Sequence, residues 1–125
     1  MRKSYITTPI YYPSGNPHLG SAYTSIAADV YARTMRLAGI DAKFTTGTDE
    51  HGQKLLRSAE KENLPPQQYV DKMSTKFSRL SEIVNLSAHD FIRTTEARHE
   101  KAATTMWQYI EENGYLYKAN YAGWY

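Results

Sequence analysis

The chain has 125 residues, 41% of them hydrophobic, and 15 Lys and Arg against 13 Asp and Glu give a formal net charge of +2. This length corresponds to one domain or part of one, and so balanced a charge excludes a disordered acidic tail and does not indicate a nucleic-acid-binding arm. The chain has no cysteine, which excludes disulfides, thiolate nucleophiles and Cys-ligated zinc within it.

A strand and then a helix are predicted at the start of the chain. Residues 4–12 are rich in β-branched and aromatic side chains, which favours a strand, and Pro9 lies near its end. The turn residues at 13–17 break this strand. Asn16 suits a helix N-cap, and Pro17 suits the first helical position. Apolar or small residues then recur at helical spacing, namely Leu19, Ala22, Tyr23, Ile26, Ala27, Val30 and Tyr31.

The next segment completes a strand–helix–strand unit. The helix is expected to end near Gly39, residues 41–46 favour a second strand, and Gly47 is expected to stop it. Two strands joined by one helix predict a parallel pair, so the sequence favours an α/β fold.

Three helices and one short strand are predicted after this unit. Residues 115–125 add four tyrosines and a tryptophan, which need a surface to pack on, so we expect a domain cut short at Tyr125. The predicted elements are a helix from 50–53 to before Leu64, a helix over 66–84, a strand over 90–94, and a helix from Thr94 or Thr95 to 113–114.

Residues 17–21, Pro-His-Leu-Gly-Ser, occupy the predicted turn from strand to helix. A helix N-terminus offers unpaired N–H groups and partial positive charge, which suit a phosphate. Gly20 allows a close approach, and His18 can donate to phosphate oxygens as charge develops on them. Parallel α/β sheets bind ligands at this end of their strands. The alternative is an ordinary helix start with a solvated histidine.

Residues 47–52, Gly-Thr-Asp-Glu-His-Gly, follow the second strand and should therefore lie beside the first turn. Asp49 can bind an ammonium group, and His51 can contact phosphate or ribose. The alternative is a helix N-cap at Thr48 or Asp49, followed by acidic residues in the first turn.

Two other patterns do not indicate sites. Asp49, Glu50 and His51 are adjacent and point in different directions, so no metal site is predicted. Residues 72–76, Lys-Met-Ser-Thr-Lys, fall inside the third predicted helix with Met73 on its apolar stripe, which indicates a helix surface and not a mobile loop.

Five blocks, in order, resemble the methionyl-tRNA synthetases, a family of class I aminoacyl-tRNA synthetases. The resemblance implies a Rossmann-like parallel sheet with flanking helices, of which residues 1–125 hold the first half only. It also implies that the anticodon-binding domain and the Lys-Met-Ser-Lys-Ser loop lie beyond Tyr125. The matching blocks are residues 7–12, 17–21, 46–54, 90–99 and 121–125.

The resemblance also implies a reaction and its participants. Members of the family activate methionine with ATP and Mg²⁺ to methionyl-adenylate and transfer it to tRNA(Met), and zinc is not supported within this chain. The implied catalytic residues are His18, Ser21 and Asp49. The implied ATP-binding residues are Pro17, His18, Gly20, Ser21 and His51, and the implied methionine-binding residues are Pro9, Ile10, Tyr12 and Asp49.

One residue departs from the family pattern. Ser21 replaces the second histidine of the His-Ile-Gly-His signature, and its hydroxyl can donate a hydrogen bond but cannot carry imidazolium charge. Two alternatives therefore stay open. One is a non-catalytic nucleotide-binding or RNA-associated remnant of a synthetase. The other is a class I synthetase for another aliphatic amino acid, which residues 46–52 disfavour.

The sequence also carries expectations about location. It holds no run of about 18 apolar residues that would span a membrane. The first residues have no apolar stretch of the kind found in a signal peptide. We therefore expect no membrane partner and a cytoplasmic protein, with an organelle matrix as the alternative.

Overall fold

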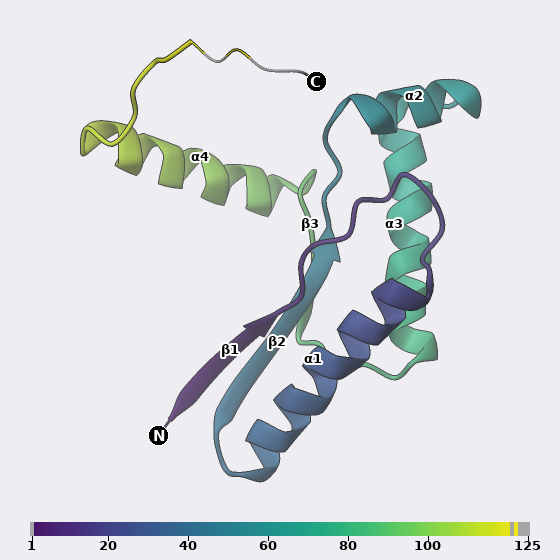
Figure 1. Ribbon diagram of the computed structural model, residues 1–125, viewed down its shortest axis with the longest axis vertical. Helices are drawn as coiled ribbons and strands as arrows, with labels where there is room; N and C mark the ends of the chain where they lie inside the picture. Colours follow the sequence, from purple (N-terminus) through teal and green to yellow (C-terminus); the bar gives the residue numbers. More distant parts are fainter. Residues whose placement is uncertain (1, 121, 123–125) are drawn as a thin grey trace. The chain divides into compact units, whose positions relative to one another are not determined.

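The computed structural model describes residues 2–120 and 122 (Figure 1). They fall into two compact units, residues 1–95 and residues 96–125. The first unit contains β1 (Lys3–Thr7), α1 (Leu19–Leu37), β2 (Asp41–Thr48), α2 (Gln53–Lys61), α3 (Pro66–Ile83) and β3 (Asp90–Arg93), and the second contains α4 (Ala97–Glu112).

The three strands form a parallel sheet in the order β1-β2-β3, which confirms the predicted α/β fold with parallel strands. Alternate residues of β2 are buried, namely Ala42, Phe44 and Thr46. Because α1 and α3 both contact β2, these two helices cover that one face of the sheet. On the other face, the hydroxyl groups of Tyr5 and Thr45 are 2.9 Å apart.

α1 buries a polar side of its surface. Its buried residues are Ser21, Ser25, Asp29 and Ala32, whereas Leu19 and Tyr23 are 84% and 74% exposed. Hydrogen bonds with the rest of the unit explain this orientation, because a buried polar group that finds a partner costs little. The helix is confirmed, but most of the apolar residues that predicted it face away from the sheet.

Asp29 shows how such a polar contact is satisfied. Its carboxylate accepts hydrogen bonds from the backbone N–H of Ser87 and from Nε of Arg33, each at 2.7 Å. Burial alone would raise the pKa of Asp29, but the bonds from Ser87 and Arg33 outweigh burial and hold the pKa below its ordinary value.

The hydrophobic core lies between α2 and α3 and includes Leu55, Ala59, Tyr69, Val70 and Met73, with Tyr12 and Leu64 packed against it. Residues 72–76 lie within α3, as predicted. Met73 is buried, while the amino groups of Lys72 and Lys76 donate to Glu62 and Asn16 at 2.6 and 2.7 Å.

Two strand boundaries differ from the prediction. β1 ends at Thr7 and not at Tyr12, because Pro9 has no N–H to continue the ladder, and Tyr11 then forms a single bridge with Thr48. Gly47 does not stop β2 but lies inside it. A Cβ at this position would lie 2.0 Å from the carbonyl oxygen of Ile92, so only glycine allows β3 to pair this closely.

Two helix starts also differ from the prediction. α1 is capped by His18 and begins at Leu19, so the expected N-cap at Asn16 with Pro17 in the first turn is wrong. Asn16 instead accepts the hydrogen bond from α3 described above. α4 is capped by Glu96 and does not begin at Thr94 or Thr95, because both of those hydroxyl groups bond to Glu50.

The second unit consists of α4 and the residues that follow it. None of the described residues of α4 is buried, and Met106, Trp107 and Tyr109 are exposed. In the block 121–125, only Ala122 is among the residues that the structure describes. Every helix in the described ranges is too short or too polar to cross a membrane.

Candidate functional site

The loops that follow β1 and β2 lie side by side at the carboxyl edge of the sheet. The N–H of Tyr11 donates to the carbonyl of Gly47 at 2.9 Å, and the N–H of Asp49 donates to the carbonyl of Tyr11 at 2.8 Å. The topology predicted this adjacency, because the carboxyl ends of neighbouring parallel strands share one edge. The segment after β1 and the segment after β2 are therefore joined directly through their backbones.

His18 begins α1, and its side chain is the N-cap. Its Nδ1 accepts a hydrogen bond from the backbone N–H of Gly20 at 3.1 Å. Since Nδ1 is the acceptor, Nε2 carries the proton of the neutral ring and is its donor. A Cβ on Gly20 would lie 2.9 Å from Cε1 of His18, so glycine lets the ring lie against the start of the helix. The cap thus presents an N–H donor beside the helix N-terminus.

A pocket of about 400 Å³ lies in front of this helix start. Its lining includes three predicted site residues, Tyr12, His18 and Ser21, although Ser21 is only 4% exposed. The carbonyl of Ser21 accepts a hydrogen bond from the Tyr11 hydroxyl at 3.1 Å. The structure therefore brings the tyrosine expected at methionine together with two of the five residues expected at ATP.

Lys54 lines the same pocket and was missed as a site residue. Its amino group lies 6.0 Å from the centre of the Tyr12 ring, which is the outer limit of a cation–π contact. The signal was present in the sequence, because Lys54 is the last residue of the third matching block, residues 46–54. It adds a positive charge to a pocket in which Ser21 has none.

Gly52 shapes the Tyr12 side of this pocket. It has a φ of 117°, which favours glycine, and a Cβ there would lie 2.7 Å from the hydroxyl of Tyr12. Gly52 is also the N-cap of α2, without a side-chain hydrogen bond. The alternative that made Thr48 or Asp49 the N-cap of this helix is therefore wrong.

The remaining predicted residues lie around this pocket or apart from it. Pro9 and Ile10 are exposed between β1 and the bridge at Tyr11, and Asp49 is half-buried. His51 lines a different hollow, of about 410 Å³, and its Nε2 lies 3.2 Å from the carbonyl oxygen of Thr94. The structure thus places Asp49 beside Tyr11 but does not bring His51 into the pocket of His18.

Glu50 and Arg93 form an ion pair that the sequence did not reveal. Arg93 donates from Nε and Nη2 to the two carboxylate oxygens of Glu50, each at 2.8 Å, and the hydroxyl groups of Thr48 and Thr95 each donate at 2.6 Å. Burial alone would raise the pKa of Glu50, but the bonds from Arg93, Thr48 and Thr95 lower it below its ordinary value. The carboxylate therefore remains charged.

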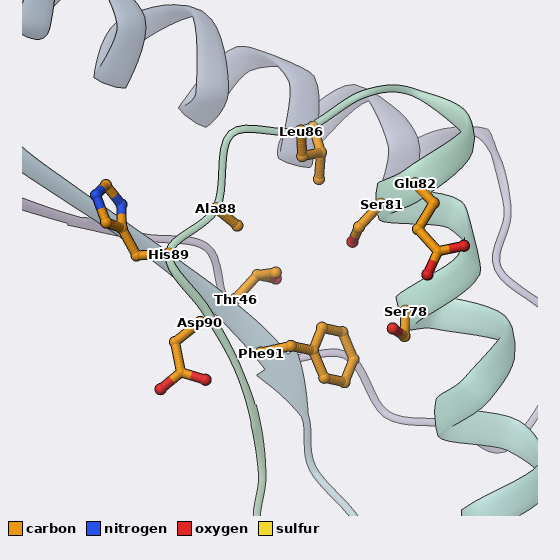
Figure 2. A pocket seen from close by; sticks show the side chains of 9 residues that line it. All are labelled: Thr46, Ser78, Ser81, Glu82, Leu86, Ala88, His89, Asp90 and Phe91. Atoms are coloured by element: carbon orange, nitrogen blue, oxygen red, sulfur yellow. The ribbon is translucent and has the colours of Figure 1, made fainter.

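A further hollow of about 370 Å³ lies between α3 and β3 (Figure 2). Thr46, Ser78 and Phe91 border it, and His89 points away from it. Of the described residues that line it, none belongs to the predicted site. It lies against the face of the sheet that α3 covers, beside Thr46 of β2 and its partner Phe91 of β3.

No metal-binding group is found within residues 2–120 and 122, where no three His, Asp or Glu side chains are placed to hold an ion. The polar groups at the carboxyl edge of the sheet are separate hydrogen-bond donors and acceptors and do not form a metal-binding cluster among the described residues. They suit a substrate that carries both phosphate and ammonium groups.

Comparison with known proteins first gives the class. Residues 4–125 match the family described as tRNA synthetases class I (M), in agreement with the parallel sheet and the paired loops at its carboxyl edge. The chain belongs to the methionyl-tRNA synthetase family within this class. Its three parallel strands and flanking helices match the Rossmann-like fold of solved methionyl-tRNA synthetases.

The relatives agree with this family. The chain is 52% identical over 121 residues to the methionine–tRNA ligase of Rickettsia felis, with 97% of the chain and 24% of the relative covered. It is 50% identical to the methionine–tRNA ligase of Bacillus subtilis, with 97% of the chain and 18% of that relative covered. A solved Mycobacterium tuberculosis methionyl-tRNA synthetase in complex with methionyl-adenylate is 41% identical, with a TM-score of 0.88 over 91% of this chain and 22% of that one. The chain thus spans about a quarter or less of the relatives that it matches.

Proposed function

We propose that residues 1–125 are the N-terminal portion of the catalytic domain of a methionine–tRNA ligase. Their role is to hold methionine and ATP while methionyl-adenylate forms. The observation that carries the proposal is the direct pairing of the two loops through Tyr11, which sets Asp49 beside the pocket of His18. The Mycobacterium tuberculosis relative was solved with methionyl-adenylate, which is the product of this step.

The reaction is an in-line displacement at the α-phosphorus of ATP. A carboxylate oxygen of methionine attacks the phosphorus, the bond to the bridging oxygen breaks, and pyrophosphate leaves. Negative charge grows on the phosphate oxygens in the transition state, and fixed donors that meet this charge lower the barrier. Mg²⁺ enters with ATP as part of the substrate.

Each residue of the site has a role in this step. The Nε2–H of His18 and the N-terminus of α1 are directed to the phosphates, with Pro17, Gly20 and Ser21 beside them. Lys54 adds a cation at the same pocket. In our proposal the ring of His51 turns from the carbonyl of Thr94 and contacts the nucleotide.

The methionine end of the substrate meets a second group of residues. Asp49 binds the ammonium group, because a half-buried carboxylate attracts a cation more strongly than an exposed one. The methionine side chain contacts Pro9, Ile10 and Tyr12. In our proposal the activated methionine is then transferred to tRNA(Met) in the cytoplasm.

The presence of Ser21 favours a second candidate function. A helix start that lacks the second imidazole can bind a nucleotide without catalysing adenylate formation. In that case the chain is a non-catalytic nucleotide-binding or RNA-associated form of the fold. The two candidates differ in whether the nucleotide reacts with an amino acid.

ATP–pyrophosphate exchange on the purified chain tests the proposal. We expect exchange that depends on methionine and not on isoleucine, valine or leucine, and that is lost in Asp49→Asn. A folded chain that binds ATP, but neither binds methionine nor catalyses exchange with any amino acid, would favour the non-catalytic candidate. Exchange with another aliphatic amino acid would reassign the substrate.

A further inference from the structure

We propose that Glu50 and Arg93 are positioning residues of this site, which hold residues 48–52 where Asp49 can meet the substrate. The part of this proposal that concerns the substrate rests on the proposed function. The part that concerns the loop rests on geometry alone.

The carboxylate of the pair is buried, and its contact with Arg93 is directional. The Glu50 side chain is 0% exposed, and Arg93 meets both of its oxygens with a two-pronged contact. Such a contact fixes the plane of the carboxylate as well as its distance, because guanidinium and carboxylate are both flat. The hydroxyl groups of Thr48 and Thr95 occupy further acceptor positions of the same carboxylate. Glu50 is therefore held in one orientation.

The backbone of the loop is held at two successive residues. The N–H of Asp49 donates to the carbonyl of Tyr11 at 2.8 Å, and the N–H of Glu50 donates to the hydroxyl of Thr94 at 2.7 Å. One bond thus joins the loop to the segment after β1, and the other joins it to the end of β3. Asp49 lies between these two anchors, so its position depends on both.

Arg93 extends the arrangement to a third element. Its Nη2 also donates to Asp71 of α3 at 2.6 Å. One guanidinium therefore connects the loop after β2, the end of β3 and the helix that covers the sheet. A buried ion pair contributes little net stability compared with apolar packing, but it enforces one arrangement of its partners. That property suits a loop that must present a carboxylate.

Amide hydrogen exchange on the folded 125-residue chain tests this inference without any substrate. The variants are Arg93→Lys, which keeps the charge but loses the two-pronged contact, and Glu50→Gln, which keeps the shape but loses the charge. The reporters are the amides of Asp49 and Glu50. The reference is the amide of His89, which donates to Phe44 at 2.8 Å, near the opposite edge of the sheet.

We expect exchange at Asp49 and Glu50 to accelerate about tenfold more than at His89 in either variant. Equal acceleration at all three amides would mean that the pair serves overall stability only, and would overturn the proposal. Glu62→Gln is the matched control, because it breaks a 2.6 Å ion pair with Lys72 on the surface and should leave the three amides unchanged. Should Glu50→Gln fail to fold, Arg93→Lys alone decides.

Methionine titration then separates this inference from the proposed function. Where the wild-type chain binds methionine, we expect Arg93→Lys to weaken methionine binding about tenfold, because only part of the loop population is then competent. Unchanged methionine binding would overturn the positioning role. A wild-type chain that binds no methionine would remove the proposed function, while the amide result still decides whether the pair holds the loop.

Discussion

The two loops of the site are held in different ways. Residues 48–52 are anchored by a buried ion pair and by two backbone bonds, whereas the helix start at His18 is exposed and carries its own cap. The anchored loop bonds to Arg93 and Thr94, more than 40 residues away, whereas the cap of the helix start bonds to Gly20, two residues away. Substitutions at the anchored loop should therefore change stability and activity together. Those at the helix start should change activity and leave stability nearly unchanged.

The largest effect should come from Gly47→Ala, which acts on the strand below the anchored loop. The new Cβ would lie 2.0 Å from the carbonyl oxygen of Ile92 and would force β3 away. We expect a loss of about 3 kcal/mol or more in the free energy of unfolding, measured by urea denaturation. Gly15→Ala is the control, since the described residues leave space around it. Equal stability of the two variants would contradict the close approach.

The next largest effect concerns the helix start, where a substitution should lower the rate of ATP–pyrophosphate exchange and not the stability. His18→Asn keeps a good N-cap but removes the imidazole donor, so stability should stay within about 0.5 kcal/mol of wild type. ATP–pyrophosphate exchange should fall about 100-fold, as expected for the loss of one transition-state donor. His18→Ala should lose the cap as well and unfold more easily. An exchange rate unchanged in His18→Asn would exclude the donor role.

A third effect concerns the loss of stability in acid, which tests the contribution of Glu50 in the anchored loop. Because the folded-state pKa of Glu50 is lowered, its stabilising contribution is complete above the ordinary pKa and is lost as the pH falls through the folded-state value. Urea denaturation between about pH 6 and pH 3 should therefore show a steeper loss for wild type than for Glu50→Gln. Parallel curves would mean that this carboxylate has no lowered pKa.

The smallest effect is expected from Ser21→His. The imidazole would add a positive charge to the pocket that holds His18 and Lys54, and we expect a rise of about threefold to tenfold in ATP–pyrophosphate exchange. Ser21→Ala is the control for loss of the hydroxyl alone. An unchanged or lower rate in Ser21→His would show that the pocket does not use a second imidazole.

Features that depend on local chemistry could be predicted from the sequence. The parallel sheet follows from the strand–helix–strand spacing, and the adjacency of the loops follows from the topology. The helical position of residues 72–76 follows from the apolar stripe around Met73. In each case neighbouring residues carry the whole signal.

Features that depend on distant partners could not be predicted in this way. Glu50 and Arg93 are 43 residues apart, and the pattern around each gives no sign of the other. Gly47 was predicted to stop β2, because the sequence around it does not show that the backbone of Ile92 in β3 approaches it so closely. The polar face of α1 is buried because Tyr11 and Ser87 bond to it, and helical periodicity alone cannot show this.

The order of events during synthesis follows from the position of Arg93 in the chain. Glu50 leaves the ribosome long before Arg93 and Thr95, and its carboxylate stays hydrated until both have emerged and β3 has joined β2. The helix start at His18 needs only its own neighbours and can form much earlier. The nascent chain therefore completes the helix start at His18 first and the anchoring of residues 48–52 last.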